Sequence, residues 1–359
     1  MNFKCRESAA LTPAHYLRIM DAFTALESGQ QVTAIVIGDV MLDAYMVGHV
    51  NRISPEAPVP VVDVHSKESR LGGAANVVKN LIAVGANVHL ATVVGNDDAG
   101  NSIESLLNRL HVGASAVIRS DDRPTTVKTR VISNGQQLVR VDEEVTTDIA
   151  HALEDELIKR CIALFESAQP DVVIFEDYDK GVLTDRVIKT LIEAANKYGI
   201  KTTVDPKFAH FASYRGVTLF KPNLKELGEG MAMAIEKTSD GNIERGVQRM
   251  HDMLNPTFSM VTLSERGVCV YGHDAAQPFC RIAAFEREIL DVSGAGDAVI
   301  AVASFLLALD VPIMDIAALS NLAGGLVCEK VGVVPVELER LKAEWMQHRD
   351  AIEPATLSQ

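Results

Sequence analysis

The stretch TAIVIGD, Thr33–Asp39, decides the fold class of this chain. Thr33–Ile37 is a short β-branched and apolar run that ends at Gly38-Asp39. A run without alternating polar positions is typical of a strand buried on both faces of a parallel sheet. Similar runs recur at Val88–Val94, Val172–Phe175, Thr202–Val204, Leu219–Phe220 and Met260–Leu263.

Helical patterns lie between several of these runs, at Ala74–Val84, Ala99–Leu110, Ile149–Ser167 and Asp185–Tyr198. This alternation predicts an α/β fold, a three-layer α/β/α sandwich with a mostly parallel central sheet. The apolar run Ala298–Leu309 is too short to span a bilayer and predicts a buried core helix.

Two β-rich segments interrupt the alternation, at about residues 44–64 and 125–141. The first has three prolines and an extended apolar stretch near Val59–Val64, and the second is a predicted hairpin around Asn134-Gly135. We expect the two to pair into a small β-sheet lid over the carboxyl ends of the main strands, where open α/β sheets bind ligands. Two unrelated surface hairpins are the alternative.

The composition narrows the class of partner. The 359 residues carry a formal net charge of −14, which argues against nucleic acid or an anionic membrane as a partner. Five scattered cysteines, with no CxxC spacing, predict no disulfide framework or zinc site and favour the cytoplasm.

The ends of the chain are expected to lie outside the main domain. No apolar segment follows Lys4 and Arg6, so we predict no signal peptide. Thr12-Pro13 instead predicts a helix start. We expect an N-terminal helical extension over residues 1–31, one α/β domain over 32–345 and a frayed tail over 346–359.

Asp291-Val-Ser-Gly-Ala-Gly-Asp297 is a candidate phosphate site. Its small residues come directly before an acid that opens the predicted core helix. The free amides of a helix start bind anions, and an aspartate beside them can accept a proton from an attacking hydroxyl. The pattern suggests phosphoryl transfer to an alcohol, and an ordinary glycine-rich turn capped by Asp297 is the alternative.

Polar residues near two earlier turns are candidate sugar ligands. Gly72 and Gly73 allow close approach to the backbone, and Asn76 offers a donor and an acceptor to hydroxyls. Asp39 and Asp43 follow the first strand, where a carboxylate can accept hydrogen bonds from a sugar. Helix–sheet packing and turn capping are the alternatives.

Three blocks in this order resemble the ribokinase (PfkB) carbohydrate kinase family: Gly72–Asn76, Lys221–Glu226 and Gly294–Asp297. The resemblance covers residues 32–345 and implies a ribokinase-like fold. Within the family, three segments most resemble the branch that phosphorylates D-glycero-β-D-manno-heptose 7-phosphate: Gly38–Val62, Gly72–Gly85 and Glu176–Leu183. Some members continue into a nucleotidyltransferase domain, and we expect this chain to correspond to the separate kinase.

The resemblance implies a role for each matching residue. Asp297 matches the catalytic base, and Gly294, Ala295 and Gly296 match the anion hole. Asn223 and Glu226 match a motif that places Mg²⁺ and the ATP phosphates, with Glu226 acting through water. The nucleotide-binding positions also include Ser264, Glu265, Gly267, Asn321 and Gly325. Asp43, Gly73 and Asn76 match sugar-contacting positions, and Asp39 and Gly72 beside them are further candidates to bind the substrate. Arg140, Lys180 and Lys207 are the candidates to meet a substrate phosphate.

Two departures from the family pattern stand out. Val292-Ser293 stands where the family commonly has Thr-Thr or Thr-Gly beside a monovalent-cation site, so the first hydroxyl is lost and potassium (K⁺) dependence is left open. Glu176 adds a carboxylate where the heptose branch often has a small residue. The resemblance also implies a homodimer formed through the lid, with apolar Val59, Val61 and Val62 compatible with it.

The expected reaction is ATP-dependent phosphorylation of a heptose 7-phosphate at O1, a step toward ADP-heptose and the lipopolysaccharide core. Another sugar or sugar-phosphate kinase of the same family is the first alternative. A non-catalytic sugar- or nucleotide-binding regulator on the same fold is the second.

Overall fold

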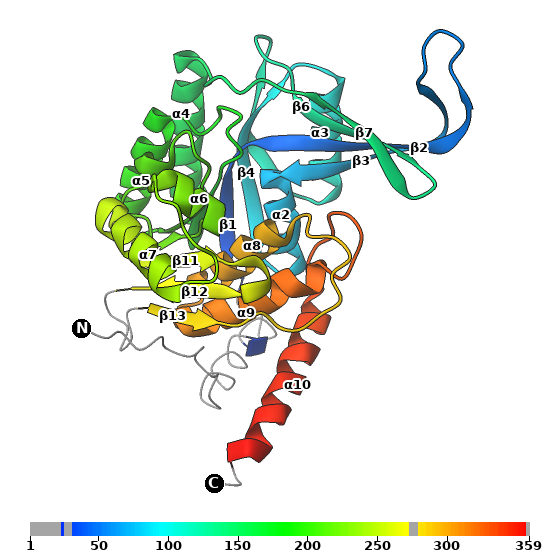
Figure 1. Cartoon of the computed structure of the whole chain (residues 1–359). Helices are drawn as coiled ribbons and strands as arrows, with labels where there is room; N and C mark the ends of the chain where they lie inside the picture. Colours follow the sequence, from blue (N-terminus) through cyan, green and yellow to red (C-terminus); the bar gives the residue numbers. More distant parts are fainter. Residues whose placement is uncertain (1–22, 25–30, 273–278, 357–359) are drawn as a thin grey trace.

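A computed structural model of the chain describes residues 23–24, 31–272 and 279–356, and within them the strands form two sheets (Figure 1). The large sheet has the strand order β13-β12-β11-β10-β9-β8-β1-β4-β5. Neighbours from β5 to β11 pair in parallel, and β12 and β13 are added antiparallel. In chain order its strands are β1 (Thr33–Gly38), β4 (Asn87–Gly95), β5 (Gly113–Ser120), β8 (Val172–Glu176), β9 (Lys201–Asp205), β10 (Leu219–Phe220), β11 (Phe258–Thr262), β12 (Val268–Tyr271) and β13 (Phe279–Ile282).

Strand β1 shows why its sequence is apolar at consecutive positions. Ala34 and Val36 pack into one hydrophobic core, whereas Ile35 and Ile37 pack into the other. Successive side chains of a strand point to opposite faces, so a strand between two cores needs apolar residues throughout. The predicted three-layer α/β/α arrangement is therefore confirmed.

The helices cover both faces of the large sheet (Figure 1). The first core packs α2 (Ala74–Ala83), α3 (Asp98–Arg109), α8 (Ala295–Ala308), α9 (Ile313–Val327) and α10 (Leu338–Thr356). The second packs α4 (His151–Ala168), α5 (Asp185–Tyr198), α6 (Leu224–Gly230) and α7 (Asp240–Leu254). Among the described residues, no helix combines the length and hydropathy needed to cross a membrane.

The smaller sheet is the predicted lid, and Figure 1 shows it projecting to one side of the main body. Its strand order is β3-β2-β6-β7. The strands are β2 (Val40–Ile53), β3 (Pro60–Gly73), β6 (Thr126–Ser133) and β7 (Gln136–Glu143). The hairpin turn at Asn134-Gly135 is confirmed, with φ of 51° and 76°.

The structure corrects three expectations about extent. The first lid segment runs over residues 40–73 rather than 44–64. Its second strand continues through His65–Ser69, which are exposed and polar and so carry no apolar pattern. Strands β5, β12 and β13 were not predicted. Helix α10 continues through most of the predicted tail, since no glycine interrupts it after Leu338. The predicted N-terminal extension lies outside the described residues, apart from Phe23, Thr24 and Gln31.

Candidate active site

Charged residues meet where the central strands end. In the parallel register Gly38 pairs with Glu176, and Glu176 pairs with Asp205 on β9. Lys221 directly follows β10 and its amide donates to the Val204 carbonyl. Because the carboxyl ends of parallel strands lie at one edge of a sheet, these side chains form a row there.

Asp297, in the first turn of α8, lies beside these strand-end residues. Gly294 precedes the helix with φ of 79°, and a Cβ there would lie 2.9 Å from Asn76 Nδ2, so glycine is required at this turn. The Ala295 amide donates to the Val292 carbonyl. The amides of Gly296 and Asp297 donate to no acceptor within the described part of the chain. These first-turn amides are available to an anion.

Two hydrogen bonds fix the Asp297 carboxylate. Asn76 Nδ2 donates to Oδ2 at 2.6 Å, and the Tyr178 hydroxyl donates to Oδ1 at 2.7 Å. Burial raises the pKa of Asp297 above its ordinary value, while the bonds from Asn76 and Tyr178 oppose that rise. A carboxylate with a raised pKa is a stronger base, and its position is set by two neighbours.

Three carboxylates converge at the strand ends. One oxygen from each of Glu176, Asp205 and Asp297 lies within 4.8 Å of the other two. Lys221 Nζ pairs with Asp205 Oδ2 at 2.7 Å, and both side chains are buried. Glu176 Oε2 is buried without a hydrogen-bond partner among the described residues. Burial, followed by the charges of Asp205 and Asp297, raises the pKa of Glu176 well above its ordinary value.

This carboxylate cluster fits a hard divalent cation. Mg²⁺ is bound by carboxylate oxygens and keeps several of its waters. The unpartnered Glu176 oxygen and the excess of negative charge over Lys221 are both features that such an ion would satisfy. The sequence expectation placed the metal at Glu226 instead, acting through water.

Asn223 and Glu226 form a capping box at the start of α6. Asn223 Oδ1 accepts from the Glu226 amide at 2.9 Å, and Glu226 Oε2 accepts from the Asn223 amide at 2.8 Å. The other Glu226 oxygen accepts from Lys207 Nζ. The motif thus stabilises a helix start, and its remaining capacity for a metal is through water.

The other predicted nucleotide positions lie on two separate elements. Ser264 and Glu265 belong to the short 3₁₀ helix η2 (Ser264–Arg266), and Gly267 follows with φ of 87°. Asn321 on α9 donates to the Ala283 carbonyl at 2.8 Å. At Gly325 a Cβ would lie 3.0 Å from Arg287 Cδ, so both α9 positions contact the segment after β13.

The two predicted sugar-binding aspartates have different partners, backbone amides for Asp39 and a lid arginine for Asp43. Asp39 is held structurally, since its carboxylate accepts the backbone amides of Tyr178, Lys180 and Val182. This is the turn-capping alternative. Asp43 Oδ1 accepts from Arg130 Nη1 at 2.6 Å.

Both predicted glycines lie where a side chain would collide. A Cβ at Gly72 would lie 2.3 Å from Asp43 Oδ2. At Gly73, where φ is 60°, it would lie 2.4 Å from the Asp39 carbonyl. The glycines therefore bring β3 and the start of α2 against the end of β1.

The three predicted phosphate cations are all engaged in ion pairs. Lys180 pairs with Glu144 at 2.8 Å, and Lys207 pairs with Glu226. Arg140 is half exposed on β7 and pairs with Asp142 on its own strand. The lid residue that reaches Asp43 is Arg130, the cross-strand neighbour of Arg140.

Sequence reasoning did not single out Tyr178, Asp205, Lys221 or Arg130 for this site. Asp205 is the last residue of β9 and Lys221 directly follows β10, and that position at a strand end was the available signal. Tyr178 lies in the Glu176–Leu183 block that supports the family resemblance. The pairing of Arg130 with Asp43 depends on a contact between segments 87 residues apart.

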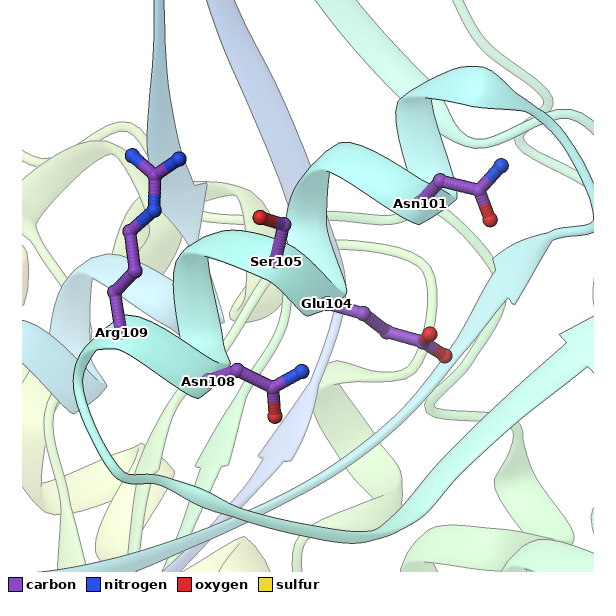
Figure 2. Close-up of a pocket in the computed structure, with 5 residues that line it drawn as sticks. All are labelled: Asn101, Glu104, Ser105, Asn108 and Arg109. Carbon is purple, nitrogen blue, oxygen red and sulfur yellow. The ribbon is translucent and has the colours of Figure 1, made fainter.

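A second hollow lies over α3 and is separate from this site. It is lined by Asn101, Glu104, Ser105, Asn108 and Arg109, all from one helix (Figure 2). Arg119 donates to Glu104 and Asn101 on that face. None of the residues predicted for catalysis or binding lines it.

The fold and the site define a phosphotransferase that uses an alcohol group as acceptor. Residues 33–339 match the pfkB family of carbohydrate kinases, and the chain belongs to that family. It is 38% identical over 303 residues to the bifunctional protein HldE of Campylobacter curvus, and 37% identical over 323 residues to HldE of Geobacter metallireducens.

These matches cover 84% and 90% of this chain but 63% and 65% of the relatives, so the chain spans under two thirds of their length. Among solved structures, Escherichia coli phosphofructokinase-2 in complex with potassium superposes with a TM-score of 0.71 at 17% identity, covering 88% of this chain and 98% of that one. At this identity the likeness concerns the fold alone.

Proposed function

We propose that this chain transfers the γ-phosphoryl group of ATP to O1 of D-glycero-D-manno-heptose 7-phosphate. The product is heptose 1,7-bisphosphate, an intermediate toward ADP-heptose for the lipopolysaccharide core. The similarity to HldE proteins supports the choice of heptose. The observation that carries the proposal is the Asp297 carboxylate, held by Asn76 and Tyr178 at the start of α8.

The chemistry follows from that placement. Asp297 accepts the proton from the anomeric hydroxyl as O1 forms a bond to the γ-phosphorus. The bond between that phosphorus and the β–γ bridging oxygen breaks, and ADP leaves with the electron pair. The amides of Gly296 and Asp297 donate to the charge that develops on the transferred group.

A divalent cation held by Glu176 and Asp205, with Glu226 reached through water, would supply positive charge to the ATP phosphates. Lys221 holds the Asp205 carboxylate in place, because the pair is bonded at 2.7 Å in a buried setting. A K⁺ ion beside this helix start would have to be held by backbone carbonyls and Ser293, because Val292 is exposed and offers no hydroxyl.

The lid gives the proposal its second part, a homodimer. Large apolar side chains are exposed on it: Ile53, Val59, Val64, Leu138, Val139 and Val141. Exposed apolar surface gathered on one small sheet is typical of a protein interface. Sedimentation of the wild type and of a Val139→Glu, Val141→Glu double variant tests this. A monomeric wild type contradicts it.

The reaction is tested by product analysis after incubation with ATP, Mg²⁺ and heptose 7-phosphate, read by ³¹P NMR and mass spectrometry. We expect a bisphosphate with the new ester at O1. A sugar panel with other phosphosugars and unphosphorylated sugars is the matched comparison. Faster turnover of any of these overturns the heptose assignment, and ATP turnover without an acceptor-dependent product overturns the kinase assignment.

A further inference from the structure

One face of the lid carries a group of cations at the base of the sheet. Asp43 and Tyr45 are two residues apart on β2 and therefore share a face. Arg70 on β3 lies opposite Asp43, and Arg130 on β6 lies opposite Tyr45. The register thus places two arginines on either side of the same two β2 residues.

The Tyr45 ring orients both guanidinium groups. Arg70 Cζ lies 4.9 Å and Arg130 Cζ lies 5.3 Å from the ring centroid. Arg130 Nη1 donates to Asp43, while Arg70 Nε and Nη2 donate to Glu68. Stacking and these bonds limit the freedom of two long side chains, and the planar fork of each retains donors for a further acceptor.

Lys79 on α2 completes the group from the main body. It lies one helical turn after Asn76 and is partly buried, and within the described residues it has no hydrogen bond or ion pair. Burial, followed by the charge of Arg70, lowers its pKa, whereas Asp43 and Asp297 act in the opposite direction. An unpaired, partly desolvated lysine beside an arginine is unfavourable unless an anion joins them.

We propose that Lys79, Arg70 and Arg130 bind the phosphate ester that the sugar substrate already carries. This rests on the proposed function and names the residues that would read the 7-phosphate. Lys79 lies one turn after Asn76, which bonds to Asp297, and Arg70 lies near the end of the strand that leads into α2. The group therefore extends from the reacting end of a bound sugar toward the lid. Bidentate arginine forks with a lysine point charge are a common phosphate-binding set.

Lys79→Met is the informative variant, because it removes a charge that pairs with no group in the part of the chain that the structure describes. We expect KM for the phosphosugar to rise about 10- to 100-fold, with kcat and KM for ATP changed less than twofold. Thermal stability should stay equal or rise, since a desolvated charge is lost. Lys67→Met, on exposed β3, is the matched control and should leave all four quantities unchanged.

Two further measurements separate the sources of phosphate. A rise in KM for ATP rather than for the sugar would assign these cations to the nucleotide and overturn the proposal. Calorimetry with inorganic phosphate alone does not depend on which sugar is the substrate. If the wild type turns over only unphosphorylated sugars, the proposed function fails, yet phosphate binding lost in Lys79→Met and kept in Lys67→Met still supports the site. No phosphate binding by the wild type overturns the site itself.

Discussion

The strand-end site and the lid both contain lysine or arginine paired with aspartate, in very different surroundings. Lys221 and Asp205 are bonded at 2.7 Å with side chains 2% and 7% exposed. Arg140 and Asp142 are bonded at 2.9 Å with side chains 50% and 25% exposed. Solvent weakens the second pair, whereas burial makes each partner of the first indispensable to the other.

This difference shows that the strongest electrostatic interactions of the two regions lie at the buried strand ends. At the strand ends, three carboxylates share a buried region with few cations, and the pKa values of Glu176 and Asp297 are raised by burial. On the lid, acids such as Asp142 have lowered pKa values, because bonds from Arg140 and Lys128 outweigh their slight burial. Deleting one charge of an ion pair should therefore change the free energy of unfolding strongly at the strand ends and only slightly on the lid.

The largest expected effect is on the rate after Asp297→Asn. The amide cannot accept the hydroxyl proton, so kcat should fall roughly 10²- to 10⁴-fold. Steady-state kinetics with the phosphosugar, together with a thermal unfolding curve, measure the loss and check folding. Tyr178→Phe is the companion variant, because it removes one bond to the carboxylate and leaves the base in place. Near-normal turnover by Asp297→Asn would contradict the assignment of the base.

Lys221→Met tests the buried charge balance directly. Methionine fills similar space but leaves Asp205 without its cation, so the free energy of unfolding should fall by about 3–5 kcal/mol at pH 8. The loss should shrink at lower pH, because protonation of the raised-pKa carboxylates relieves their repulsion. Urea unfolding at two pH values measures both effects. A loss below about 1 kcal/mol would place this pair with the lid pairs.

Asp177, on the loop after β8, should make the free energy of unfolding depend on pH. Its carboxylate accepts from the Tyr214 hydroxyl and the Asp179 amide. Burial, then the charge of Asp39, raises its pKa from 3.8 to about 7. The folded state therefore binds this proton more tightly, so the stabilisation is full below about pH 3.8 and is lost as pH rises through about 7.

Asp177→Asn should remove that dependence. The unfolding free energy of the wild type relative to the variant should fall between pH 4 and 8, by at most about 4 kcal/mol at 1.36 kcal/mol per pKa unit. Asp142→Asn on the lid is the control with the opposite sign. The pKa of Asp142 is lowered, so its contribution is lost as pH falls. If the unfolding free energy of the wild type relative to each variant changed with pH in the same direction, the predicted opposite pKa shifts of Asp177 and Asp142 would be contradicted.

The sequence predicted the main sheet because its strands are buried on both faces and so read as apolar runs. Most of β3 escaped prediction, since His65–Ser69 are exposed and polar. Asp297 could be selected because glycines and a helix start adjoin it in the chain. The partnership of Lys221 with Asp205 could not, because it arises from the adjacency of β9 and β10 rather than from a local pattern.

The smallest expected effect is that of Arg140→Met on the lid. Its pair with Asp142 is exposed on β7, so the free energy of unfolding should change by less than about 1 kcal/mol. The same variant distinguishes the two arms of the hairpin, because Arg130, not Arg140, bonds to Asp43. If Arg130 faces the substrate phosphate, KM for the phosphosugar should be unchanged in Arg140→Met and raised in Arg130→Met. A raised KM in Arg140→Met alone would mean that the lid closes with its edge strand β7 over the site. The difference in burial between the strand-end pair and the lid pair would then hold only for the open molecule.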